Sequence, residues 1–153
     1  NLVIDDLGLY EGSPVKADLD ASCPLILADA TQIRQVVHNL IQNGIDASVE
    51  AHQNNQFSIL VKTEFLPYPE SANAGAGIVK LSILDAGTGF APRILSRAFE
   101  PYVTTKAKGT GLGLAMVKKI VDEHGARIEL RNRMEESQVV GAEVSIYFNQ
   151  LVE

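Results

Sequence analysis

Residues 30–50 carry apolar side chains at the period of an α-helix, over roughly six turns. The repeat comprises Ile33, Val36, Val37, Leu40, Ile41 and Ile45. Asp29, followed three residues later by Gln32, resembles the capping box that opens many helices. Because a helix with one apolar stripe must bury that stripe, this segment predicts a long helix packed on another layer of structure.

Alternating apolar residues elsewhere predict strands that supply this second layer. The first has Val15, Ala17 and Leu19 on its buried side, and residues 25–27 form a brief second one. Further strands are expected at 57–66, 78–84, 126–130 and 142–148, and shorter helices near 94–95 and over 112–124. The glycine- and proline-rich segment 67–77 predicts an antiparallel hairpin. The expected fold is an α/β two-layer sandwich, with a mixed, mostly antiparallel sheet packed on about three helices.

Composition narrows the class of ligand and partner. The chain has 153 residues, 46% of them hydrophobic, and a net charge of −6, which fits a folded domain and argues against nucleic-acid binding. Cys23 is the single cysteine and suits a reducing cytoplasm. No apolar run approaches the ~20 residues of a membrane span, so direct membrane contact is not expected. Because the chain opens on Asn1, we expect residues 1–14 to be a lead-in from a preceding helical domain, with the domain itself at 15–153.

Asn39 and Asn43 are unusual inside a helix, since asparagine has a low helix propensity. At helical spacing they share a stripe with Gln32, Gln35 and Asp46 along the edge of the apolar face. Such a stripe is suited to line a polar cleft, although for two asparagines taken alone a solvated helix flank is the favoured interpretation. Gly44 falls on the apolar face, where it allows close packing.

Asp85 ends an apolar strand and precedes Ala86, Gly87, Thr88 and Gly89. A carboxylate at a strand end beside two glycines can accept a hydrogen bond from a ligand amine while the backbone approaches the ligand ring. An ordinary turn is the alternative interpretation. A dinucleotide fold fits poorly, because Pro92 stands at the third glycine position.

Three alternate glycines, Gly109, Gly111 and Gly113, lead directly into the second helix. Backbone amides at such a helix start can bind phosphate oxygens. Four lysines and no acidic residue lie between residues 101 and 119, which makes this segment positive. The Walker pattern is absent, and a flexible hinge is the alternative.

Taken in order, these motifs resemble the ATP-binding domain of sensor histidine kinases, within the wider group that includes gyrase, Hsp90 and MutL. Residues 39–43 are similar to the N box, 85–89 to the first glycine box, 99–106 to the F box and lid, and 109–115 to the second glycine box. The lid form is similar to the nitrogen-regulation type of kinase. The resemblance covers the chain from about Asp29 onward and implies the Bergerat ATP-binding fold, with ATP and Mg²⁺ as cofactors.

The resemblance also implies roles for particular residues. Asp85 would accept the adenine amino group beside Gly87 and Gly89, and Asn43 would bind Mg²⁺. Asn39 would position the phosphates and Lys106 would hold their charge. The remaining nucleotide contacts would come from Asp46, Tyr102, Thr104, Thr105, Gly109, Thr110, Gly111, Leu112 and Gly113.

Position 39 implies transfer of the phosphate rather than hydrolysis. ATP-hydrolysing members of the group carry a glutamate four residues before the metal asparagine, whereas Asn39 cannot take a proton. His38, His52 and His124 lack the acidic neighbour of the family's phosphoacceptor, so that histidine is expected on a separate dimerisation domain, with a response regulator downstream.

The sequence departs from the family pattern at several positions. Ala86, Thr88 and Gly44 are changes that we expect to be tolerated. Asp46 stands where many relatives have a basic residue, which leaves its role open. An anti-sigma-factor type of serine/threonine kinase and a non-catalytic nucleotide-binding module are therefore kept as alternatives.

Overall fold

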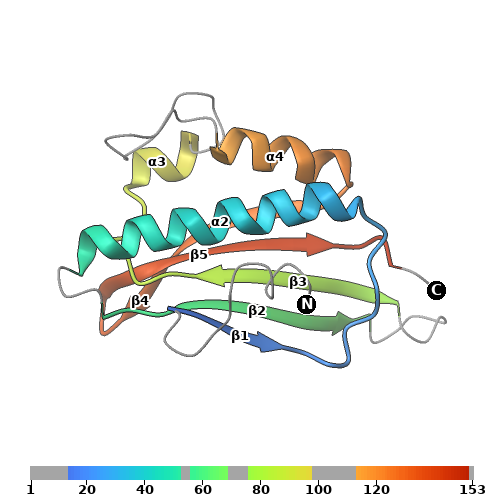
Figure 1. Ribbon diagram of the computed structural model, residues 1–153, viewed down its shortest axis with the longest axis horizontal. Helices are drawn as coiled ribbons and strands as arrows, with labels where there is room; N and C mark the ends of the chain where they lie inside the picture. Colours follow the sequence, from blue (N-terminus) through green and yellow to red (C-terminus); the bar gives the residue numbers. More distant parts are fainter. Residues whose placement is uncertain (1–13, 53–55, 69–75, 98–112, 152–153) are drawn as a thin grey trace.

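The computed structural model describes residues 14–52, 56–68, 76–97 and 113–151. Its elements, in chain order, are β1 (Val15–Leu19), α2 (Ala30–Ala51), β2 (Ile59–Pro67), β3 (Gly77–Leu84), α3 (Pro92–Arg97), α4 (Gly113–Glu123), β4 (Arg127–Glu135) and β5 (Gln138–Phe148) (Figure 1). None of the described helices is long and apolar enough to cross a membrane.

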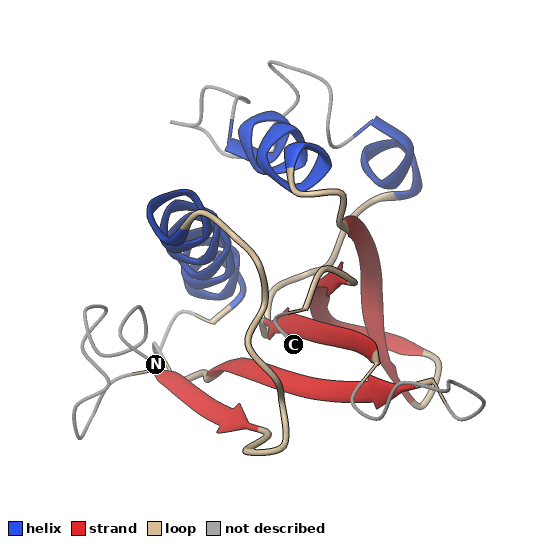
Figure 2. Cartoon of the chain, turned by 90° about the vertical axis from the view of Figure 1, so that its right-hand side faces the viewer, coloured by secondary structure: helices blue, strands red, loops and turns tan. Residues whose placement is uncertain are grey.

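The strands form one five-stranded sheet in the order β1-β2-β3-β5-β4. β1 and β2 run parallel, and every other neighbouring pair is antiparallel, including the β2–β3 hairpin. The helices lie on one face of the sheet (Figure 2). The predicted two-layer sandwich with a mixed, mostly antiparallel sheet is thus confirmed.

Helix α2 buries its apolar stripe against the sheet. Val36, Leu40 and Ile41 are at most 2% exposed, and Ile59 and Ile146 beneath the helices are fully buried. At the N-cap, the side chain of Asp29 accepts from the backbone N–H of Gln32 (3.1 Å), as the sequence predicts.

A capping box has a second hydrogen bond, donated by the backbone N–H of the N-cap residue, and here His124 at the end of α4 accepts it. The backbone N–H of Asp29 donates to its Nε2 (3.0 Å) rather than to the Gln32 side chain. Because Nε2 must then be the acceptor, Nδ1 carries the proton and donates to the carbonyl of Ile120 (2.8 Å). The His124 side chain therefore joins the start of α2 to the end of α4.

Two expectations about the first strands are wrong. Val15 is buried, but Ala17 and Leu19 are exposed, because β1 is the edge strand and α2 packs over β2, β3 and β5. Residues 25–27 make a single bridge, from Ile26 to Leu151, instead of a strand. In the second of these places a short apolar run was present, but only Ile26 packs against the core, while Leu25 and Leu27 are exposed.

Helix α4 ends as predicted, with Gly125 in the left-handed region (φ 63°). We expect Gly125→Ala to lower the free energy of unfolding by about 1–2 kcal/mol, because a Cβ disfavours this conformation. Gly125→Asn should cost less, since asparagine tolerates it better. Urea unfolding of both variants measures the difference, and equal stability of the alanine variant and the wild type would contradict the assignment.

Candidate nucleotide-binding site

Helix α2 is the element on which three of the predicted motifs meet. A Cβ placed on Gly113, at the start of α4, would lie 3.2 Å from both amide atoms of Asn39. One turn further along α2, a Cβ on Gly44 would lie 3.2 Å from the Cβ of Asp85. Gly113, the last glycine of the second glycine box, therefore lies against Asn39 of the N box, and Asp85 lies against Gly44, the residue that follows the N box on α2.

The two asparagines act as a pair. Nδ2 of Asn43 donates to Oδ1 of Asn39 at 3.0 Å, and both side chains are half-buried. This arrangement favours the polar-cleft interpretation over a solvated helix flank. Amide oxygens are acceptable ligands for Mg²⁺, which takes few protein ligands and completes its shell with phosphate and water. The donor set therefore fits a magnesium–polyphosphate ligand.

Asp85 lies just beyond β3 and is 8% exposed. Its Oδ1 accepts from the backbone N–H groups of Gly87 (2.8 Å) and Ala142 (2.9 Å). Burial raises the pKa of Asp85, although these two hydrogen bonds and the charge of Arg133 act in the opposite direction. Both described bonds involve Oδ1, so Oδ2 is the carboxylate oxygen suited to a ligand amino group.

Strands β4 and β5 both contact the backbone carbonyl of Asp85. The guanidinium of Arg133 donates to its backbone carbonyl. Gly141 passes so close that a Cβ there would lie 2.0 Å from the same carbonyl oxygen. A β-bulge between Arg133 and Met134 accompanies this contact. The position of the carboxylate thus depends on residues far from it in sequence.

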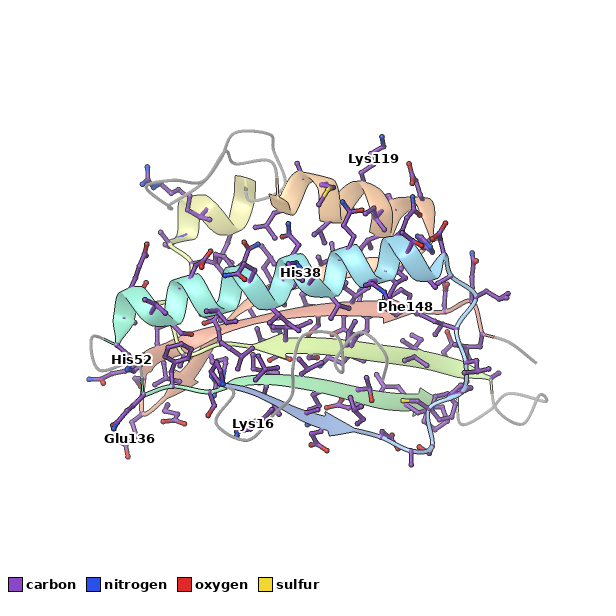
Figure 3. The ribbon with its side chains drawn as sticks, viewed as in Figure 1. Lys16, His38, His52, Lys119, Glu136 and Phe148 are labelled. Carbon is purple, nitrogen blue, oxygen red and sulfur yellow. The ribbon has the colours of Figure 1, made fainter. Side chains whose placement is uncertain are left out.

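The loop after Asp85 is held at both ends by side chains. The backbone N–H of Ala86 donates to Oγ of Ser48 (3.0 Å), and Nε2 of His52 donates to the Ala86 carbonyl (2.8 Å). At the other end, Oδ1 of Asn132 accepts from the N–H of Phe90 (2.7 Å), and its Nδ2 donates to the Phe90 carbonyl (2.9 Å). Figure 3 shows His52 at the C-terminal end of α2.

Sequence reasoning missed these supporting residues. Only Ser48 left a signal, because it continues the apolar face of α2 after Ile41 and Ile45 as a fully buried polar residue. Asn132 and Arg133 lie beyond the strand that the sequence predicts at 126–130, in the longer β4 of the structure, and nothing in their spacing points to the loop that they bind.

The glycines of the first glycine box are close-packed. A Cβ on Gly87 would lie 2.9 Å from the Cβ of Ala47, which brings the loop against α2. Gly89 has φ 79°, a conformation that disfavours other residues. These two positions accordingly require glycine.

Asp46 accepts a hydrogen bond from Gln42 on its own helix (3.0 Å). The remaining predicted site residues lie outside the described part of the chain: Tyr102, Thr104, Thr105, Lys106, Gly109, Thr110, Gly111 and Leu112. Of the lysines counted in the positive segment, Lys118 pairs with Asp122 (2.7 Å), and Lys119 points away from the sheet (Figure 3).

An α/β sandwich with asparagines, a buried aspartate and a glycine loop gathered on one helix defines a class of nucleotide-binding domain. The model of the histidine kinase-, DNA gyrase B-, and HSP90-like ATPase family matches residues 28–151. The chain belongs to this family.

Among curated relatives, a putative NtrY-like sensor histidine kinase of Rickettsia bellii is 39% identical over 121 residues, covering 79% of this chain and 17% of that protein. The sensor histidine kinase ZraS of Escherichia coli K12 is 40% identical over 110 residues, covering 72% of this chain and 21% of ZraS. The chain thus spans about a fifth of the length of the relatives that it matches.

Solved structures agree with this assignment. The catalytic domain of the histidine kinase ThkA superposes with a TM-score of 0.73 at 28% identity, covering 97% of this chain and 90% of that domain. Full-length ShkA in complex with AMPPNP superposes with a TM-score of 0.65 at 27% identity, covering 91% of this chain and 26% of ShkA.

Proposed function

We propose that this chain is the ATP-binding catalytic domain of a two-component sensor histidine kinase of the nitrogen-regulation type. In this proposal it presents the γ-phosphate of ATP to a histidine on a separate dimerisation domain. The observation that carries the proposal is the meeting of Asn39 with Gly113, and of Gly44 with Asp85, along α2. Family membership and the kinase relatives support it.

Asp85 is proposed to select the base. Its buried carboxylate accepts hydrogen bonds only, so it suits the exocyclic amino group of adenine and disfavours the carbonyl of guanine. The backbone at Gly87 and Gly89 would approach the ring. A charge-assisted bond at a shielded site contributes roughly 1.5–3 kcal/mol.

Asn43 is proposed to bind Mg²⁺ through its side-chain oxygen, and Asn39 to orient Asn43 and the phosphates. The 3.0 Å bond between the two amides supports this division of roles. When bound, Mg²⁺ neutralises charge on the polyphosphate. Gly113 leaves space against Asn39, and Lys106 with residues 109–112 would provide the remaining phosphate contacts.

Position 39 holds an asparagine and not a glutamate, so no carboxylate is present at this position to activate water. A side-chain amide does not accept a proton at neutral pH, so we infer phosphotransfer rather than hydrolysis. Catalysis would then consist of positioning and charge neutralisation. The partners are a histidine-containing dimerisation domain and a downstream response regulator, and the site of action is the cytoplasm.

Titration of the chain with ATP, with and without Mg²⁺, tests the nucleotide site. Adding an isolated acceptor domain with radiolabelled ATP tests the reaction. We expect Mg²⁺-dependent binding and acid-labile phosphate on histidine. Label on serine or threonine of a protein substrate would favour the anti-sigma-factor type of kinase, and binding without transfer to any partner would favour a non-catalytic module.

A further inference from the structure

The loop that follows β3 must hold a defined backbone shape beyond its first residue, Asp85, whose backbone N–H still donates to the carbonyl of Ala142 on β5 (2.9 Å). Residues 86–90 have no regular secondary structure, so hydrogen bonds of the strand ladder do not shape them. Buried backbone groups nevertheless need hydrogen-bond partners. Side chains from two distant elements provide them here.

Asn132 on β4 binds both polar backbone groups of Phe90. Because its Oδ1 accepts from the N–H (2.7 Å) and its Nδ2 donates to the carbonyl (2.9 Å), only one orientation of the amide satisfies both bonds. A Cβ on Gly89 would lie 2.7 Å from Asn132 Oδ1. Asn132 therefore contacts the loop at the glycine whose φ is positive.

The C-terminal end of α2 binds the opposite end of the loop in the same way. Ser48 accepts from the Ala86 N–H, and His52 donates to the Ala86 carbonyl. Between these two ends, Oδ1 of Asp85 accepts from Gly87. The backbone is thus held on both sides of the glycines that would approach the base.

We propose that Asn132, with Ser48 and His52, positions the loop 85–90 for base binding, so that the adenine end of the site is preformed before nucleotide arrives. This rests on the proposed function, since it presumes that the loop receives a base. A preformed loop lowers the ordering cost of binding. Loss of the hydrogen bonds at one end of the loop should therefore weaken the binding of the base, and should leave the contribution of Mg²⁺ to nucleotide affinity unchanged.

The test compares Asn132→Ala and Asn132→Asp with Asn149→Ala, an exposed asparagine beyond β5 that serves as the matched control. We expect Asn132→Ala to raise the Kd of ATP and of ADP by the same factor, roughly tenfold, with an unchanged ratio of affinities with and without Mg²⁺. Asn132→Asp has nearly the same shape but cannot donate to Phe90, so it should also weaken binding. Rescue by this variant would mean that packing alone matters, and would overturn the proposal.

Amide hydrogen exchange in the nucleotide-free chain provides a second, independent readout. Exchange at residues 87–90 should be about tenfold faster in Asn132→Ala, while amides in the middle of α2 keep their rates. His52→Phe should have the same effect, whereas His52→Gln, which keeps a donor, should have a smaller one. Unchanged exchange in the loop overturns the proposal. A wild-type chain that binds no ATP would instead overturn the proposed function, and the exchange experiment still reports on the loop.

Discussion

Asp85→Asn is expected to weaken ATP binding by one to two orders of magnitude while making the folded chain more stable at neutral pH. Asparagine keeps an oxygen that can accept from Gly87 and Ala142, so the local hydrogen bonds survive. It replaces the second oxygen by an amide donor, which opposes the amino group of adenine. Loss of a shielded, charge-assisted bond accounts for roughly 10- to 100-fold in Kd.

The expected gain in stability follows from the pKa of Asp85. Burial raises this pKa above its ordinary value of 3.8, so the folded chain disfavours the charged carboxylate. Below that ordinary value the side chain is neutral in both the folded and unfolded states, and asparagine brings no advantage. As the pH rises through the pKa of the folded state, the charged aspartate becomes a liability that asparagine lacks.

Urea unfolding at several pH values measures this difference, and Asp18→Asn, on the exposed face of β1, is the matched control. The stability gap between Asp85→Asn and the wild type should be absent below pH 3.8 and should open as the pH rises. A gap independent of pH would contradict the electrostatic explanation. Equal loss of ATP and GTP affinity would contradict base selection by Asp85.

Asn43→Ala is expected to remove the Mg²⁺-dependent part of ATP affinity and to reduce phosphotransfer by roughly 100-fold. The variant loses the oxygen proposed to bind the metal and the 3.0 Å bond that orients Asn39. The fold should survive, because that bond is worth about 1 kcal/mol and alanine has the higher helix propensity.

Calorimetric titration with and without Mg²⁺ separates these effects, with His38→Ala, an exposed residue of the same helix, as the control. Circular dichroism verifies that α2 is intact. If the variant keeps the Mg²⁺ dependence of the wild type, Asn43 is not the metal ligand. If it loses affinity equally with and without Mg²⁺, its role is confined to orienting its neighbour.

Periodicity was sufficient for the elements that form the core. Helix α2 and strands β3 and β5 bury or partly bury the apolar residues that their spacing predicts, and β2 fully buries only Ile59 and Val61 of its predicted set, because the covering layer lies over these residues. The same method was wrong for Ala17, Leu19 and residues 25–27. Alternation states which side chains share a face, but it does not state whether anything covers that face.

The residues of the site likewise fall into those that the sequence indicates and those that only the structure reveals. Asn39, Asn43, Asp85 and the glycines stand out in sequence because their residue types are unfavourable in ordinary helices and strands. Asn132 does not stand out, and Ser48 does so only as a polar residue on the apolar face of α2, since their partners lie 42 and 38 residues away. No local pattern contains such a contact.

By itself, the sequence determined the helix, the strands of the core and the residue types suited to a nucleotide, because these depend on spacing and on the chemistry of single side chains. Only the tertiary structure decided which of them meet. The close approach of Gly113 to Asn39, the burial that raises the pKa of Asp85, and the hold of Asn132 on Phe90 all arise from packing of segments far apart in the chain. Desolvation and hydrogen bonding at such contacts depend on distance in space, which a linear sequence does not contain.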